Sequence, residues 1–170
     1  FASFLEDSVL RPLGMYQTRL ARRESPPDAH RATGYRREGD RFVVDDVRDH
    51  RSVGSGGVYS TLPDILTWYQ AVMAGRLLKP SSTALLFETP VTLSGSRSYL
   101  GMGWSNETLG SRTRDVAGLR AYGSFGELAG FRSAILFYPD HGVAWIALSN
   151  SGEGALPPEG MAGRLFQRLP

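Results

Sequence analysis

The sequence predicts an α+β fold, in which helices pack on an antiparallel sheet. Apolar positions in residues 1–98 mostly follow a helical period interrupted by one short hairpin, whereas residues 99–170 hold antiparallel strands and a C-terminal helix. The two clearest strands are joined by a tight turn, which makes them antiparallel neighbours. With 170 residues, 41% of them hydrophobic, the chain is long enough for one domain and too short to expect two.

The first expected element is a helix over residues 1–10, followed by a loop. The apolar face of this helix holds Phe1, Phe4, Leu5 and Val9. Pro12 and Gly14 are expected to end it. Residues 15–33 show no sustained period and contain two prolines, so they are interpreted as a surface loop.

A short hairpin is expected next, with strands at residues 34–36 and 41–44 and a turn at Glu38-Gly39-Asp40. The segment Gly54-Ser55-Gly56-Gly57 then reads either as a linker or as a place where the backbone approaches something closely. The same segment lacks the preceding strand, the lysine and the helix of a phosphate-binding loop.

Two helices are expected before the strands begin. Thr61 and Asp64 have the spacing of a capping box, and Pro63 suits a first helical turn. The apolar stripe that follows contains Leu62, Ile65, Leu66, Tyr69, Val72 and Met73. Gly75 is expected to close this helix, and a shorter one is expected over residues 81–87.

The last part of the chain reads as a meander. Strands are expected over residues 100–104, 115–122, 131–138 and 143–148. Pro139-Asp140-His141-Gly142 forms the tight turn between the last two of them. A final helix is expected from Pro157-Pro158 onward.

Composition removes several classes of function. The net charge of only +2 gives little support to nucleic-acid or polybasic membrane binding. The longest apolar run, residues 143–148, is too short for a transmembrane helix. Cysteine is absent, and the three histidines show no metal-ligand spacing, so no metal or cofactor is expected. Lys79 is the only lysine, and an active-site lysine must therefore be Lys79 or lie outside this chain.

No complete catalytic set can be assembled from these residues, since Ser-x-x-Lys, Tyr-x-Asn and Gly-x-Ser-x-Gly are all missing. A series of short segments nevertheless resembles the C-terminal portion of the serine β-lactamase and penicillin-recognising superfamily, near class C β-lactamases, D-aminopeptidases and related esterases. In order, the segments are Arg11-Pro-Leu-Gly-Met15 with Thr18, Gly34-Tyr35, Gly56 to Asp64 with Trp68, Leu100-Gly-Met-Gly-Trp104, Gly130-Phe131-Arg-Ser133, Pro139-Asp140 and Leu148-Ser149-Asn150.

This resemblance covers nearly the whole chain. It implies a β-lactamase/transpeptidase-like fold that lacks its N-terminal part, with residues 1–170 as the C-terminal segment of a single domain. Members of the family use a Ser-x-x-Lys motif, a Tyr-x-Asn motif and a third motif, Lys-Thr-Gly or His-x-Gly, on a strand beside the nucleophile. The segment like Phe1 to Met15 follows the first two motifs in relatives, so both are expected upstream of Phe1.

The third motif maps by resemblance onto Ser124-Phe125-Gly126. Gly126 fits the pattern, because a strand that passes beside substrate favours a residue without Cβ. Ser124 departs from it, since the usual residue is a cation that orients a substrate carboxylate. Glu127 would donate its backbone N–H to an oxyanion hole. Alternatively, Ser124 is an ordinary strand residue, and Gly126 serves packing alone.

Substrate contacts are assigned to Phe125 and, without a deciding sequence argument, to Tyr122. The resemblance implies a serine hydrolase that cleaves an ester, amide or β-lactam through an acyl-enzyme. The segment alone should be inactive; alternatively, the parent protein is a non-catalytic binding or scaffold protein. Expected partners are a small-molecule substrate, the missing N-terminal portion and a second copy through an exposed sheet edge. The family favours a bacterial periplasmic or secreted location.

Overall fold

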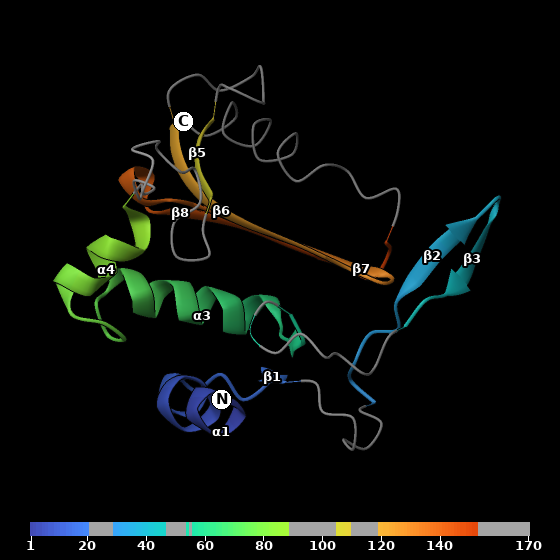
Figure 1. The fold of residues 1–170 in the computed structure, drawn as a ribbon, viewed down its shortest axis with the longest axis horizontal. Coiled ribbons are helices and arrows are strands. Elements are labelled where there is room, and N and C mark those ends of the chain that lie inside the picture. Colours follow the sequence, from blue (N-terminus) through green and yellow to red (C-terminus); the bar gives the residue numbers. More distant parts are fainter. Residues whose placement is uncertain (21–28, 47–53, 55, 89–104, 110–118, 153–170) are drawn as a thin grey trace, which may run out of the picture. The chain divides into compact units, whose positions relative to one another are not determined.

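The computed structural model of the chain describes residues 1–20, 29–46, 54, 56–88, 105–109 and 119–152. It contains helices and antiparallel strands, so the predicted α+β class is confirmed (Figure 1). The strand expected at residues 100–104 and the helix expected from Pro157 lie outside the described residues.

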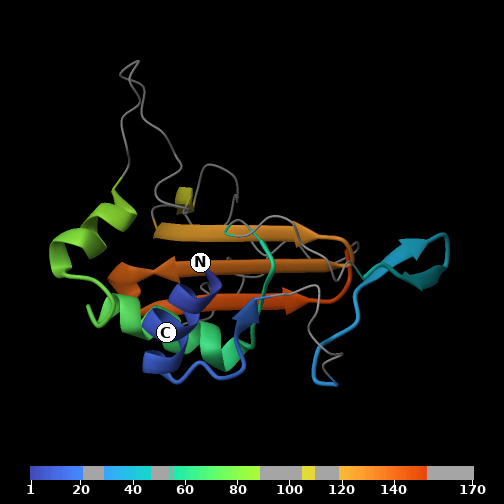
Figure 2. The same ribbon diagram turned by 60° about the horizontal axis from the view of Figure 1, so that its bottom comes forward.

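A four-stranded sheet is the main β element, and its strands follow the order β5-β6-β7-β8. They span Ser105–Leu109, Leu119–Leu128, Phe131–Tyr138 and Val143–Ser149. Figure 2 shows β6, β7 and β8 side by side as three long neighbours. The last two strands are confirmed. The strand expected to stop at Tyr122 continues to Leu128, so it includes the segment Ser124-Phe125-Gly126 that the resemblance places on a strand. The pattern of apolar residues missed this extension, because glycine and serine are weak strand formers.

The described residues belong to two compact units. One unit holds residues 1–71, 126–133 and 148–155, and the other holds residues 72–125, 134–147 and 156–170. In the second unit the buried side chains come mainly from the sheet, and they include Tyr122, Ala134, Leu136, Phe137 and Tyr138. The ring of Phe87 packs against that of Tyr122, with centroids 4.5 Å apart.

The N-terminal helical segment is longer than expected. It consists of α1 (Ala2–Leu5), a π-helical turn (Glu6–Leu10) and α2 (Arg11–Leu13). The expectation that Pro12 ends the helix is wrong, because Pro12 lies in the first turn of α2, where no backbone N–H is needed. Gly14 ends the segment with φ of 75°.

The interpretation of the following residues as a surface loop is wrong for their first part. Arg19–Leu20 forms strand β1, which pairs antiparallel with β4 at Val58–Tyr59. Met15 and Thr18 are buried in this unit. The buried side chain of Thr18 is hydrogen-bonded to a distant carboxylate, a long-range partner that no local sequence pattern reveals.

The expected hairpin is present. Strands β2 (Tyr35–Glu38) and β3 (Arg41–Val44) pair antiparallel, with Tyr35 opposite Val44 and Glu38 opposite Arg41. Gly39 occupies the turn with φ of 60°. Phe42 and Val44 remain largely exposed.

Helix α3 spans Leu62–Met73, as expected, and α4 spans Pro80–Phe87. The backbone N–H of Asp64 donates to Thr61 Oγ1 at 3.4 Å, which confirms half of the capping box. Gly75 follows α3 with φ of 66°. Among the described residues, no helix has the length and apolar character needed to cross a membrane.

Candidate functional site

Strand β6 carries all the residues predicted for the third motif. Ser124 is half-buried, and Gly126 and Glu127 are exposed. Phe125 keeps 40% of its surface exposed. Side chains alternate along a strand, so positions 124 and 126 face one side of β6 while 125 and 127 face the other.

Tyr122 lies two residues before Ser124 on the same strand. Its side chain is only 6% exposed and packs on Phe87, which is a core environment. Its contact with substrate stays a prediction, as does that of Phe125.

Gly126 has a close neighbour on strand β7. A Cβ atom at this position would lie 2.5 Å from Ser133 Oγ, closer than real Cβ atoms approach. Packing therefore gives one reason for glycine here. Because Gly126 is exposed, the bare backbone is also accessible from outside the strand, so the packing reason and a substrate-facing role are compatible.

The side chain of Glu127 pairs with Arg132 of β7. Arg132 Nη2 lies 3.2 Å from Glu127 Oε1, and the two side chains are 39% and 72% exposed. An ion pair this exposed contributes little to stability. Arg132 Nε, by contrast, is buried and has no hydrogen-bond partner among the described residues. The pair links the two strands next to their turn.

Residues from three distant segments hold the β6–β7 turn. Tyr35 N–H lies 2.9 Å from Asn150 O and 3.3 Å from Gly130 O, and Gly152 N–H donates to Tyr35 O at 2.8 Å. A Cβ at Gly130 would lie 2.2 Å from Asp45 O, and its φ is 72°. Only glycine satisfies both the space and the backbone conformation at this position.

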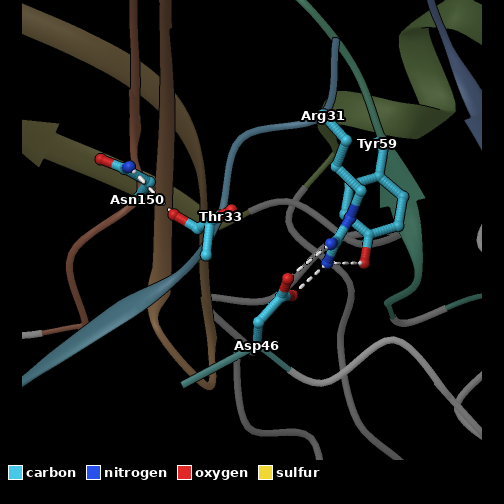
Figure 3. A network of polar contacts seen from close by, with 5 residues as sticks. All are labelled: Arg31, Thr33, Asp46, Tyr59 and Asn150. Carbon is cyan, nitrogen blue, oxygen red and sulfur yellow. Dashed lines mark hydrogen bonds and ion pairs between the residues drawn. The ribbon is translucent and has the colours of Figure 1, made fainter. Parts of the chain in front are cut away.

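A half-buried cation, Arg31, lies next to this turn (Figure 3). Arg31 Nη1 donates to Asp46 Oδ2 at 2.7 Å, and Nη2 contacts both Asp46 Oδ1 and the hydroxyl of Tyr59. The guanidinium lies 4.5 Å from the centroid of the Tyr59 ring and 5.5 Å from that of Phe131. The hydrogen bond to Asp46 raises the pKa of Arg31, so the cation stays charged despite partial burial.

No sequence pattern points to Arg31 or Asp46. None points to the hydrogen bond that Asn150 Nδ2 donates to Thr33 O at 3.0 Å (Figure 3). A lone arginine and a lone aspartate carry no local signal of a pair. The motif segments Gly34-Tyr35, Gly130-Phe131 and Leu148-Ser149-Asn150, however, were identified, and they meet at this turn.

The described residues contain no cluster of three His, Cys, Asp or Glu side chains that could hold a metal ion. The polar groups described at the end of β6 and the start of β7 are backbone N–H groups, the hydroxyls of Ser124 and Ser133, and the ion pair of Glu127 and Arg132. These groups can position and polarise a carbonyl group, but the sequence supplies no Ser-x-x-Lys nucleophile and base.

A family model and a curated relative of this chain point to the same family. A family model described as Beta-lactamase matches residues 1–168. Penicillin-binding protein 4* of Bacillus subtilis (strain 168) is 26% identical over 166 residues, which cover 90% of this chain and 35% of that protein.

Solved structures share the fold. The octameric penicillin-binding protein homologue from Pyrococcus abyssi superposes with a TM-score of 0.77 at 18% identity, covering 97% of this chain and 36% of that one. D-amino acid amidase from Ochrobactrum anthropi SV3, complexed with D-phenylalanine, gives a TM-score of 0.69 at 21% identity, covering 98% and 51%. The chain thus spans between a third and about half of these relatives.

Proposed function

The chain belongs to the beta-lactamase family, and from this premise we propose that it forms the C-terminal part of a serine hydrolase that acts through an acyl-enzyme. The substrate is an ester or an amide, and the amides include β-lactams and peptide-like compounds. The catalytic serine and its base lie in the full-length protein N-terminal to Phe1. Residues 1–170 supply the strand that lies against the substrate.

The observation that supports this proposal is the open end of β6. Strand β5 pairs with Leu119–Gly123, and no described strand pairs with residues 124–128 on that side. Residues that flank a two-residue turn exchange hydrogen bonds with each other, so we expect Leu128 N–H to point toward β7. The N–H of Glu127 then points toward the open edge, where a substrate carbonyl oxygen can accept its hydrogen bond.

The proposed reaction follows from this geometry. The upstream serine hydroxyl attacks the carbonyl carbon and loses its proton to the base, while Glu127 N–H stabilises the negative charge on the oxygen. The leaving alcohol or amine takes the proton as its bond to carbon breaks. Water then attacks the acyl-enzyme, releasing the acid and restoring the serine hydroxyl.

Ser124 sets the expected substrate charge. Its hydroxyl can form hydrogen bonds but supplies no positive charge at the position of the family's cation. Neutral esters and amides should therefore react better than substrates that carry a penicillin-type carboxylate. Replacing the hydroxyl with a cation, as in Ser124→Lys, should improve turnover of the carboxylate-bearing substrate nitrocefin relative to a neutral ester.

The direct test compares the full-length protein with the isolated 170-residue chain. Nitrocefin and short-chain nitrophenyl esters are the substrates. We expect the full-length protein to hydrolyse the neutral esters and the isolated chain to hydrolyse nothing. Robust turnover by the isolated chain, abolished by a substitution within residues 1–170, contradicts the proposal.

The lack of a charge at Ser124 favours one second candidate, a non-catalytic binding or scaffold protein. Mass spectrometry of the full-length protein after incubation with a nitrophenyl ester separates the two. An added acyl mass, or turnover, supports the enzyme. The absence of both, with retained binding of a neutral ester, supports the binding protein.

A further inference from the structure

Ser133 is the nearest side chain to the exposed glycine of the third motif. Its Oγ occupies the space that a Cβ at Gly126 would fill, and both residues belong to the same compact unit. The serine comes from β7 and the glycine from β6, so the contact joins neighbouring strands. The hydroxyl therefore faces the same side of the sheet as positions 124 and 126.

The hydroxyl of Ser133 has no protein hydrogen bond among the described residues. It is also not one of the buried side-chain atoms that lack a partner. A hydroxyl that is neither bonded nor fully buried reaches solvent, and Ser133 as a whole is half-buried. It is thus a polar group whose donor and acceptor capacity is unused within the described part of the chain.

The described charged side chains next to Ser133 in sequence and register form one ion pair. The adjacent guanidinium of Arg132 is paired with Glu127, and alternation places that pair on the opposite side of the strands. On the side of Ser133 and Gly126, the strand residue two positions before the glycine is another neutral serine. Among the described strand residues next to Gly126 on this side, two serine hydroxyls are the polar side-chain groups, and they suit an uncharged polar group better than a carboxylate.

We propose that Ser133 is a specificity-determining residue that hydrogen-bonds an amide group in the acyl part of the substrate. The proposal rests on the hydrolase function proposed above and specifies its substrate class as uncharged and amide-bearing. The exposed glycine permits the substrate to approach the backbone closely, and the hydroxyl beside it can donate to the amide oxygen or accept from the amide N–H.

The test uses the full-length protein and two nitrophenyl esters, one of acetate and one of N-acetylglycine. Only the second has an amide in its acyl part. Ser133→Ala should lower kcat/KM for the N-acetylglycine ester about tenfold and leave that for acetate unchanged, because only the amide loses a hydrogen bond. Ser3→Ala, an exposed change of the same chemistry in α1, should alter neither.

Ser133→Cys is the second variant, since a thiol of similar shape is a weak donor and acceptor. It should give a smaller loss than alanine, again confined to the amide-bearing ester. An equal loss on both esters indicates a structural role and overturns the proposal, as does an unchanged selectivity in both variants. If the wild-type protein hydrolyses neither ester, the hydrolase function itself fails and this proposal fails with it.

Discussion

Thr18 Oγ1 donates a 2.7 Å hydrogen bond to Asp64 Oδ2, although 46 residues separate the two in sequence. The backbone N–H of Gln17 donates to the same oxygen at 3.0 Å, and Ser60 Oγ lies 2.7 Å from the threonine hydroxyl. Thr18 and Asp64 are both buried. One carboxylate thus joins the segment that follows α2 to the first turn of α3.

Asp64→Ala should destabilise the full-length protein by about 1–3 kcal/mol, because the Gln17 N–H loses its acceptor and the buried Thr18 hydroxyl keeps only Ser60 as a partner. Urea denaturation followed by circular dichroism measures the change. Asp40→Ala, in the exposed hairpin turn, is the matched control and should leave the midpoint unchanged. Equal midpoints for the two variants would show that the Asp64 contacts contribute nothing.

The ion pair of Arg31 and Asp46 should matter far more than that of Arg37 and Asp40. The side chains of Arg31 and Asp46 are 15% and 5% exposed, whereas the side chain of Asp40 is fully exposed. Asp46→Ala leaves a mostly buried guanidinium unpaired and should cost about 3 kcal/mol or more, while Arg37→Ala should change little. Thermal denaturation of the two variants provides the comparison.

The pH dependence of that effect follows from the raised pKa of Arg31. A raised pKa in the folded state means that the stabilisation is present below the ordinary arginine value and lost only above it. The destabilisation by Asp46→Ala should therefore be the same at about pH 7 and about pH 9. A loss that shrinks as pH rises across this interval contradicts the assignment.

Gly130 and Gly142 allow backbone strain and crowding to be separated. Their φ values are 72° and 62°, but a Cβ at Gly130 would meet Asp45 O at 2.2 Å, whereas one at Gly142 meets nothing within 4 Å. Gly142→Ala should cost about 1–2 kcal/mol for the left-handed conformation alone. Gly130→Ala should cost markedly more, as measured by denaturation, and equal costs would mean that the turn relaxes freely.

The isolated chain should not remain monomeric. Apolar side chains stay exposed in both compact units, with Phe1, Phe4 and Phe42 in one and Leu85 in the other. Such surface favours association, so we expect a dimer or larger species, or a complex with the N-terminal part of the same protein when the two are mixed. Light scattering at micromolar concentration measures this, and a monodisperse monomer counts against it.

Sequence patterns predicted the elements whose signal is local. The period of α3, the glycine turn of the β2–β3 hairpin and the apolar runs of β7 and β8 each depend on neighbouring residues, and these elements formed where expected. Strand β1 was missed, because Arg19–Leu20 is too short to show alternation and pairs with β4 across the chain.

The candidate site shows the same difference between features with a local sequence signal and features that depend on distant residues. Resemblance identified Gly126 and Glu127, but not the position of Ser133 against the glycine, since that contact depends on the register of two strands. The burial of Tyr122 against Phe87 was equally hidden, because an aromatic residue in a strand is compatible with either face.

The β6–β7 turn also constrains the order of events during synthesis. Asn150 contacts Thr33 across 117 residues, and Tyr35 bonds to both Gly130 and residues at the end of β8. Contacts with such long sequence separation form late, after the costly closure of the intervening loop. A ribosome must therefore release residue 152 before the segment around Tyr35 can complete its hydrogen bonds. Until then this part of the fold is incomplete, and partly folded chains that still expose apolar surface are prone to aggregate.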